Sequence, residues 1–289
     1  MFGPSVYATQ ALHGMVYGML LFLVSSGLTL VFGMMGILNI AHAAFYMLGA
    51  YLAYTTVAAT GSFWLSLLVA PIMVGLLGAA VERGLLRRIH RFGHAYELLL
   101  TFGLFYMMAE AVRWIWGNYT LEVPTPALLT GSIPLLGSQY PVYRLFILAF
   151  SGLICLGMAT VLLRTRVGII IRSAVADGEM VSALGINTPL VALGVFSVGA
   201  ALAAIAGVIA APFLQADPAM GAAILVDSFV VVVVGGFGSL LGALLASLMI
   251  GELQSFGILW FPAFAMVFQF LLMAAVLVLR PQGLFGEKG

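Results

Sequence analysis

The distribution of charged residues constrains the fold of this chain more than any other feature. Residues 1–81 carry no acidic or basic side chain apart from two histidines, and Glu82 is the first charge. Further charge-free runs cover residues 145–163, 180–216, 228–251 and 253–279. Each run approaches or exceeds the ~20 residues that a helix needs to cross a bilayer. Lipid offers the backbone no hydrogen-bond partners, so crossing segments must be helices or closed barrels.

The runs do not alternate apolar and polar residues as barrel strands do, so they predict an all-α polytopic membrane protein. Only 7% of the residues are charged, against about 25% in soluble domains. We expect a single transmembrane domain over residues 1–289 with about eight to nine membrane helices. The predicted helices cover residues 10–32, 38–58, 63–81, 94–116, 143–163, 190–211, 222–235, 238–256 and 258–279. The Gly-rich pieces around 33–45 and 222–245 are candidates for broken or re-entrant segments.

The positions of Lys and Arg predict the orientation, because these residues favour the cytoplasmic side of a membrane. Nine of the eleven basic residues fall in residues 82–93, in residues 164–189, or at the C-terminal end as Arg280 and Lys288. An even number of predicted crossings separates these segments, so all three can face the cytoplasm. The Pro-rich loop 117–142 then faces outside, and three crossings before Glu82 place the N-terminus outside as well.

A weak internal repeat appears when the chain is shifted by 202 positions. The shift places Gly33, Gly36, Leu38, Ala41, Ala44, Met47 and Gly49 on Gly235, Gly238, Leu240, Ala243, Ala246, Met249 and Gly251. Paired Gly-interrupted segments of parallel or inverted repeats often mark the substrate path of a transporter. Small residues at helical spacing also simply allow helices to pack closely. Both explanations stay open, and both predict helix breaks or close approaches at the centre of the protein.

Enzyme chemistry has little support in the sequence. Cys155 is the single cysteine, and no Cys/His cluster has metal-ligand spacing, so we expect no metal site. A nucleotide-binding loop needs Gly-Lys-Ser/Thr, and the one lysine is Lys288, so the chain has no ATPase motif of its own. The net charge of +1 indicates no nucleic-acid partner. We therefore expect neither catalytic residues nor a cofactor in this chain.

The loop 164–189 is too polar to span a membrane and too apolar for a mere linker. Val175, Gly178, Val181 and Leu184 recur at helical spacing, which predicts a short amphipathic helix. Such a helix can dock into a groove on another protein or rest on lipid headgroups. Gly185 would stop this helix, because glycine adopts the left-handed conformation at low cost.

Several motifs together resemble the LivH-type branched-chain amino acid permeases. Glu179 and Gly185 have the E-x-x-x-x-x-G spacing of the E-A-A loop, which contacts the ATPase in ABC importers. The other matching stretches are residues 27–33, 39–42, 47–51, 164–187, 235–243 and 280–286, so the resemblance covers most of residues 20–288. Met180 and Val181 replace the two alanines of the motif, and Ala43 stands where glycine often follows the histidine.

The resemblance implies the permease subunit of an ATP-driven importer in the bacterial inner membrane. A second, LivM-like permease, two cytoplasmic ATPase subunits holding ATP and magnesium, and a periplasmic binding protein would be its partners. The substrate would be a branched-chain or other small amino acid, with urea, short amides or aromatic acids as alternatives. A secondary transporter or channel is the rival class. It usually needs carboxylates within the membrane, and the charge-free runs argue against it.

Two sets of residues are candidates for these roles. The contact with the ATPase would be made by Val175, Asp177, Glu179, Val181, Leu184 and Gly185. The substrate path would be lined by Asn39, His42, Gly235, Gly236, Gly238 and Glu252. Polar groups at membrane depth mark a path or a bond between helices. For His42 a bond between helices is slightly favoured, and for Asn39 the two are even.

Overall fold

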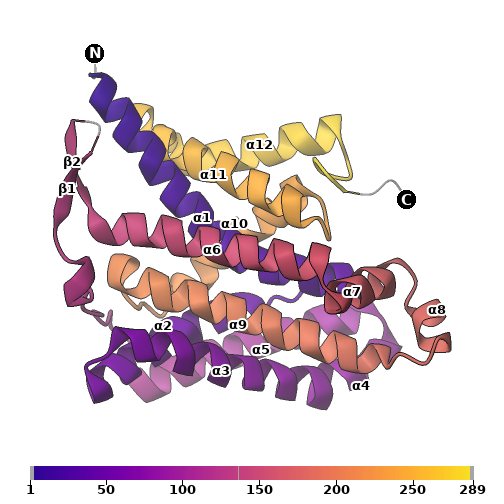
Figure 1. Cartoon of the computed structure of the whole chain (residues 1–289). Coiled ribbons are helices and arrows are strands. Elements are labelled where there is room, and N and C mark those ends of the chain that lie inside the picture. The colour runs from indigo at the N-terminus through magenta and orange to yellow at the C-terminus, as the bar shows by residue number, and fades with distance from the viewer. Residues whose placement is uncertain (1–2, 136, 287–289) are drawn as a thin grey trace.

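Helices make up nearly the whole molecule, which Figure 1 shows as a computed structural model describing residues 3–135 and 137–286. Within these residues, nine helices of 15 residues or more form the bundle. They are α1 (Pro4–Met35), α2 (His42–Thr60), α3 (Phe63–Val81), α5 (His94–Trp116), α6 (Val142–Arg164), α9 (Thr188–Leu214), α10 (Met220–Gly235), α11 (Leu240–Trp260) and α12 (Ala265–Leu279). The predicted fold class and all nine predicted helices are confirmed, and α3 and α5 have the predicted bounds.

Shorter elements connect the bundle helices. They are η1 (Glu82–Leu86), α4 (Arg87–Ile89), η2 (His90–Phe92), η3 (Ala127–Leu129), β1 (Ser132–Leu135), β2 (Ser138–Pro141), α7 (Arg166–Ala176), α8 (Gly178–Ala183) and η4 (Pro262–Phe264). The two strands form an antiparallel pair in which Ser132 faces Pro141. Neither strand is predicted by the sequence pattern, because each has only four residues.

Seven helical stretches in the described ranges are long and apolar enough to cross a membrane. The helices α2 and α10 fall short of this standard, since α10 has only 16 residues and α2 is less apolar. Most of α2 is buried inside the bundle, including Phe45, Met47 and Tyr51. Neighbouring helices pack against both elements, which therefore need less apolar surface than helices that face lipid. The predicted number of eight to nine membrane helices includes α2 and α10.

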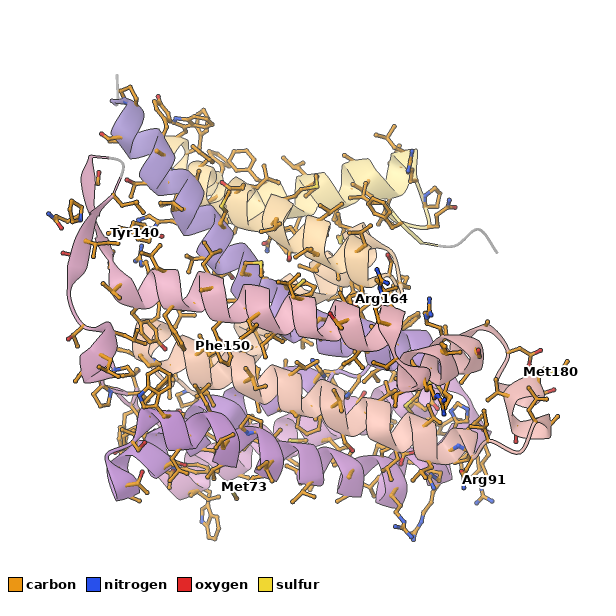
Figure 2. All side chains as sticks on the ribbon, viewed as in Figure 1. Met73, Arg91, Tyr140, Phe150, Arg164 and Met180 are labelled. Atoms are coloured by element: carbon orange, nitrogen blue, oxygen red, sulfur yellow. The ribbon has the colours of Figure 1, made fainter. Side chains whose placement is uncertain are left out.

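The two ends of the bundle carry different loops. Figure 2 shows Arg91, Arg164 and Met180 at one end and Tyr140 at the opposite end. The C-terminal segment lies at the first end, and the start of α1 lies at the second with the loop 117–142 (Figure 1). This arrangement agrees with the predicted topology, although Lys288 lies outside the described residues. The positive-inside rule predicts that the Arg-rich end faces the cytoplasm.

The internal repeat is parallel. Helices α1 and α10 both run toward the Arg-rich end, and α2 and α11 both run back from it (Figure 1). Gly36 and Gly238, which the repeat aligns, both have positive φ, at 69° and 78°. Gly33 and Gly238 also meet, because a Cβ built on Gly238 would lie 3.3 Å from the Cα of Gly33. The predicted breaks and approach are confirmed, but they lie at helix ends beside the C-terminal segment and not at the centre of the protein.

Two pairs of helices cross at glycine contacts in the core. On α9, a Cβ at Gly207 would overlap the carbonyl oxygen of Tyr46 and lie 2.9 Å from the nitrogen of Ala50, both on α2. On α1, a Cβ at Gly18 would lie 2.8 Å from the carbonyl oxygen of Ser247 on α11. The missing side chains let the backbones touch, and such close packing stabilises helix pairs in a membrane.

Candidate functional site

The segment between α6 and α9 forms a hairpin of two short helices, α7 and α8, at the Arg-rich end. Asp177 separates them with an extended backbone, and its Oδ1 accepts a 2.9 Å hydrogen bond from the backbone N–H of Met180. After α8, Gly185 has φ 86° and donates its N–H to Ser182 at 3.0 Å, and Ile186 donates to Val181 at 3.3 Å. This pair of bonds is a Schellman motif, so the prediction that Gly185 ends the helix is confirmed.

The prediction of one amphipathic helix through Val175 and Leu184 is wrong. Aspartate favours the N-cap position over the interior of a helix, and Asp177 therefore divides the stripe between α7 and α8. Val181 is buried at 4% exposure and anchors α8, whereas Val175 and Leu184 are 46% and 73% exposed. Asp177, Glu179 and Gly185 are exposed as well. Five of the six candidate ATPase-contact residues thus lie on the surface of one hairpin.

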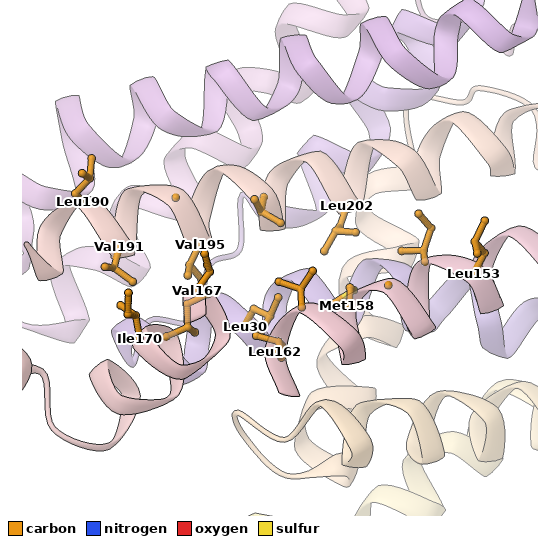
Figure 3. A pocket seen from close by; sticks show the side chains of 16 residues that line it. Leu30, Leu153, Met158, Leu162, Val167, Ile170, Leu190, Val191, Val195 and Leu202 are labelled. Atoms are coloured by element: carbon orange, nitrogen blue, oxygen red, sulfur yellow. The ribbon is translucent and has the colours of Figure 1, made fainter. Parts of the chain in front are cut away.

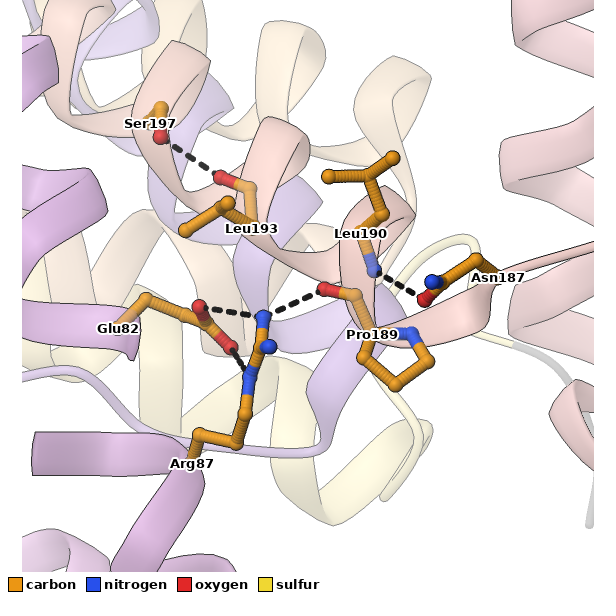
Figure 4. Close-up of polar contacts among 7 residues, drawn as sticks. All are labelled: Glu82, Arg87, Asn187, Pro189, Leu190, Leu193 and Ser197. Carbon is orange, nitrogen blue, oxygen red and sulfur yellow. Dashed lines mark hydrogen bonds and ion pairs between the residues drawn. The ribbon is translucent and has the colours of Figure 1, made fainter. Parts of the chain in front are cut away.

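The base of this hairpin is tied to the bundle by polar contacts (Figure 4). Arg87 forms a two-pronged ion pair with Glu82, which is only 2% exposed, and donates a further 2.8 Å bond to the carbonyl of Pro189. Asn187 caps α9 by accepting the N–H of Leu190 at 3.1 Å. These contacts join the segment after α3 to the start of α9, which directly follows the hairpin.

An apolar groove runs beside the hairpin, with a volume of about 610 Å³. Side chains of α6 and α7, among them Met158 and Ile170, face side chains of α9 across it (Figure 3). All of its lining residues are apolar or glycine. A pocket that orients a small polar solute needs a few convergent polar groups, so this groove does not have the character of a substrate site.

Asn39 and His42 do not share a helical face. Helix α2 begins at His42, and Asn39 lies in the connection before it. The Nε2 of His42 donates a 2.9 Å hydrogen bond to the Val24 carbonyl on α1, which favours the helix-bonding role. Asn39 is 2% exposed, and its side-chain nitrogen and oxygen have no hydrogen-bond partner in the described part of the chain. It lines a largely apolar pocket of about 380 Å³.

The glycine candidates serve packing contacts at the turn from α10 to α11. A Cβ on Gly235 would lie 2.5 Å from the carbonyl carbon of Gly242. Gly236, with φ 97°, packs on the backbone of Gly286 in the C-terminal segment. Gly238 meets Gly33, as described above. These contacts identify the turn as a structural joint.

Glu252 lies at the α1–α11 crossing. A Cβ on Gly14 would be 2.6 Å from its Oε2, which is buried and has no hydrogen-bond partner among the described residues. The neighbouring Gly251 lines a polar pocket on the same crossing. Glu252 therefore lies next to a residue of this pocket but does not line it, and its place on a substrate path stays a prediction.

This polar pocket, which we name the outer pocket, lies toward the end of the molecule that carries β2. It has a volume of about 350 Å³. Its polar lining consists of Gln10, His13, Tyr17, Arg144, Gln254 and Ser255, and its other lining residues are Val16, Phe213, Leu214, Gly251 and Ile258. His13 stacks on Tyr140 of β2, with ring centroids 5.2 Å apart. In the sequence, Arg144 lies just after the loop 117–142, and no motif marks it as a site residue.

Sequence reasoning also misses a partly buried carboxylate that links three helices of the bundle. Asp227 on α10 accepts a 2.6 Å hydrogen bond from the hydroxyl of Tyr17 on α1 and a 2.9 Å bond from the amide of Gln269 on α12. An ionisable residue in a membrane helix is a functional candidate by default. Asp227 is the one charge between residues 218 and 251, and that isolation is the signal that could have identified it.

A bundle of apolar helices long enough to cross a membrane, with a partly polar pocket and an exposed helical hairpin at one end, defines a polytopic membrane protein of the kind that transport subunits form. Comparison with protein families gives the particular family. The model described as "Branched-chain amino acid transport system / permease component" matches residues 10–277. The chain belongs to this family, which confirms the resemblance seen in its motifs.

Curated relatives match over nearly the full length. The chain is 29% identical to the "High-affinity branched-chain amino acid transport system permease protein BraD" of Pseudomonas aeruginosa, over 97% of this chain and 96% of the relative. It is 28% identical to the LivH protein of Escherichia coli K12, described in the same words, with the same coverage. A "Probable branched-chain amino acid transport permease protein LivH" of Methanocaldococcus jannaschii is 26% identical over 94% of this chain and 90% of the relative. No solved structure matches the chain.

The chain is thus a permease subunit of an ABC importer, and with seven apolar spans it is a multi-pass protein of the inner membrane. Membership of a transport system implies partner subunits that bind ATP and a protein that delivers the substrate.

Proposed function

We propose that the chain forms part of the membrane path for branched-chain or other small amino acids, driven by ATP hydrolysis in partner subunits. The near-complete coverage of relatives named for branched-chain amino acid transport carries this proposal. The partners are a second, related permease, two ATPase subunits that hold ATP and magnesium, and a binding protein on the outer side. Lipid surrounds the remaining exposed apolar surface.

The α7–α8 hairpin supports the proposed contact with the ATPase. Exposing leucine and valine side chains to water at the polar end of a membrane protein is unfavourable, and a partner protein that covers them removes this cost. Leu184 is 73% exposed, Met180 is 59% exposed, and Val175 joins them on the same hairpin. The buried side chain of Val181 packs α8 against the rest of the protein. Because Arg87 and Asn187 fasten the base of the hairpin, a push on its tip reaches α3 and α9.

Transport by the reconstituted complex tests the substrate class. The chain, its partner permease and the ATPases are purified together and placed in vesicles with the binding protein. We expect ATP-dependent uptake of leucine, isoleucine or valine, and no comparable uptake of urea, acetamide or benzoate. Uptake of urea or benzoate in preference to the amino acids would replace the proposed substrate with one of the family alternatives.

The hairpin is tested with two exchanges, Glu179→Lys and Leu184→Asp. Both side chains are exposed, so we expect the permease to insert and to purify normally. ATPase association or transport-coupled ATP hydrolysis should fall about tenfold or more, since removing a central apolar contact of an interface costs roughly 2 kcal/mol or more. Leu128→Asp is the matched control, because Leu128 is 81% exposed at the opposite end. A double variant that assembles and transports at the wild-type rate would exclude the hairpin as the ATPase contact.

A further inference from the structure

The outer pocket holds a cation without a carboxylate partner. Arg144 belongs to the first turn of α6 and is partly buried. Its guanidinium lies 4.7 Å from the ring centroid of Phe213, and its Nη1 lies 2.6 Å from Nδ1 of His13. Among the described residues, no Asp or Glu forms an ion pair with it. A partly buried guanidinium held by an aromatic ring and an imidazole is ready to bind a carboxylate through two parallel hydrogen bonds.

One helical turn further along α1, the same pocket presents a hydrogen-bond acceptor. His13 and Tyr17 both line it and are four residues apart, so they are neighbours on one helix face. The hydroxyl of Tyr17 donates its single proton to Asp227 at 2.6 Å. Its oxygen therefore has lone pairs left to accept a hydrogen bond. The negative charge of Asp227 behind this oxygen makes it a favourable site for a cationic donor.

The same pocket also has an apolar part, with Phe213, Leu214, Ile258 and Val16 in its lining. An acceptor for a cation, a binder for a carboxylate and an apolar surface are the three features that complement a zwitterionic amino acid with a hydrocarbon side chain. The volume of about 350 Å³ accommodates such a molecule with water. Urea and short amides lack the carboxylate, and simple aromatic acids lack the ammonium group, so both would leave one polar feature unused.

We propose that the outer pocket is a binding site for zwitterionic amino acids on their way through the permease. Arg144 binds the α-carboxylate, the oxygen of Tyr17 accepts from the α-ammonium group, and Asp227 acts through Tyr17 as a positioning residue. The inference rests on the proposed function and adds to it a location and a reason for the substrate class. It places one recognition step in the permease itself, beyond the selection made by the binding protein.

The test uses the complete complex in vesicles, with the binding protein loaded with radiolabelled leucine. The loaded protein is identical for every variant, so a change in uptake arises in the permease. We expect Arg144→Gln and Tyr17→Phe each to lower leucine uptake about tenfold or more, the effect of losing a charge-assisted hydrogen bond. Arg144→Lys should retain part of the uptake. Arg113→Gln, which removes an exposed arginine paired with Glu110 at the same end, should leave uptake unchanged.

A second readout separates substrate binding from other roles of Arg144. Stimulation of ATP hydrolysis by the unliganded binding protein should be the same in wild type and variants. Loss of that stimulation in Arg144→Gln would make Arg144 a docking residue and overturn the proposal. A defect that appears only in phosphatidylglycerol vesicles, and not in phosphatidylcholine vesicles, would identify a lipid headgroup as the ligand and also overturn it.

The remaining outcomes are equally decisive. If Arg144→Gln does not assemble, Tyr17→Phe and Arg144→Lys decide, because both retain most of the packing. If the wild-type complex transports leucine and these variants transport it equally well, the pocket is not a binding site, but the proposed function still holds. A wild-type complex that transports no amino acid would reject the proposed function, and the pocket assignment would fall with it.

Discussion

The α2–α9 crossing and the α1–α11 crossing use the same packing device in different surroundings. Each brings two backbones into contact at glycine, Gly207 in the first and Gly18 in the second. Around Gly207 the neighbours are buried alanine, valine and isoleucine residues of α9. Away from Gly18, toward the start of α1 and the end of α11, the two helices contribute Gln10, His13, Gln254 and Ser255 to the outer pocket. We name these the dry crossing and the wet crossing.

With the proposed role of the outer pocket, the difference suggests a division of the bundle into a packed frame and a polar region. Backbone contact at glycine contributes to holding both pairs of helices together, so less of the stability has to come from the side chains beside the contact. The side chains beside the two contacts can therefore differ. Small apolar groups surround the dry crossing, and the wet crossing has polar groups that are able to form hydrogen bonds with a solute.

The largest effect is expected when the dry crossing is overfilled. Gly207→Leu places side-chain atoms on the backbone of Tyr46 and Ala50, and overpacking of this kind costs about 3 kcal/mol or more. We expect little folded permease by size-exclusion chromatography. Gly194→Leu on the same helix is the control, because a Cβ there meets no atom within 4 Å. Equal yields of the two variants would show that the crossing is not tightly packed.

A smaller change tests whether the two crossings are equally tight. Gly207→Ala and Gly18→Ala each add one methyl group against backbone atoms, and each should cost about 1–3 kcal/mol. The thermal unfolding midpoints of the purified complexes measure this cost. Gly103→Ala on α5, where the space is open, should be neutral or slightly stabilising. A midpoint unchanged by Gly18→Ala alone would mean that the wet crossing opens readily.

The exchange Asp227→Asn tests the negative charge that is bonded to Tyr17 of the wet crossing, because it keeps the shape of the side chain. The asparagine oxygen can still accept from Tyr17, so we expect the free energy of unfolding to change by about 1.5 kcal/mol or less. Leucine uptake should fall several-fold, because the Tyr17 oxygen loses the negative charge behind it. Glu122→Gln, an exposed change on the outer side, serves as the control. Uptake equal to that of wild type would show that the carboxylate has only a packing role.

The smallest effects are expected at the helix caps of the two crossings. Asn187 caps α9, and Ser239 caps α11 by accepting the N–H of Gly242 at 3.1 Å. Each exchange to alanine should cost about 1 kcal/mol. Asn187→Asp and Ser239→Thr, which can retain the cap, should cost less than the alanine exchanges in the same thermal measurement. Alanine variants as stable as these replacements would show that the caps are not needed.

The sequence predicts the helices well and their polar contacts poorly. Apolar runs bounded by charges determine where membrane helices lie, so α3 and α5 have the predicted bounds. Glycines that recur at helical spacing also indicate the joints, as Gly235 and Gly238 do. These features depend on local composition, which the sequence contains in full.

Contacts between distant segments are not contained in local composition. Tyr17 and Asp227 are 210 residues apart, and no periodicity links them. Asp227 separates two apolar runs in the sequence, although in the structure it is partly buried and joins α10 to α1 and α12. Charge-free runs therefore do not rule out a carboxylate within the membrane, and family membership is what excludes the rival transporter class. Asp177 shows a similar limit at short range, because spacing alone does not reveal that its side chain caps α8 and divides the amphipathic stripe.

Accessibility of single cysteines tests the contrast between the two crossings most directly. In the assembled complex with Cys155→Ala, a charged, membrane-impermeant thiol reagent is added from the outer side to Gln254→Cys in the wet crossing and Ala203→Cys in the dry crossing. We predict that Gln254→Cys is labelled, that leucine-loaded binding protein with ATP slows this labelling, and that Ala203→Cys, at a position with 0% exposure, is not labelled. Labelling at both positions, or at Ala203→Cys alone, would contradict the division of the bundle into a rigid frame and a solute path.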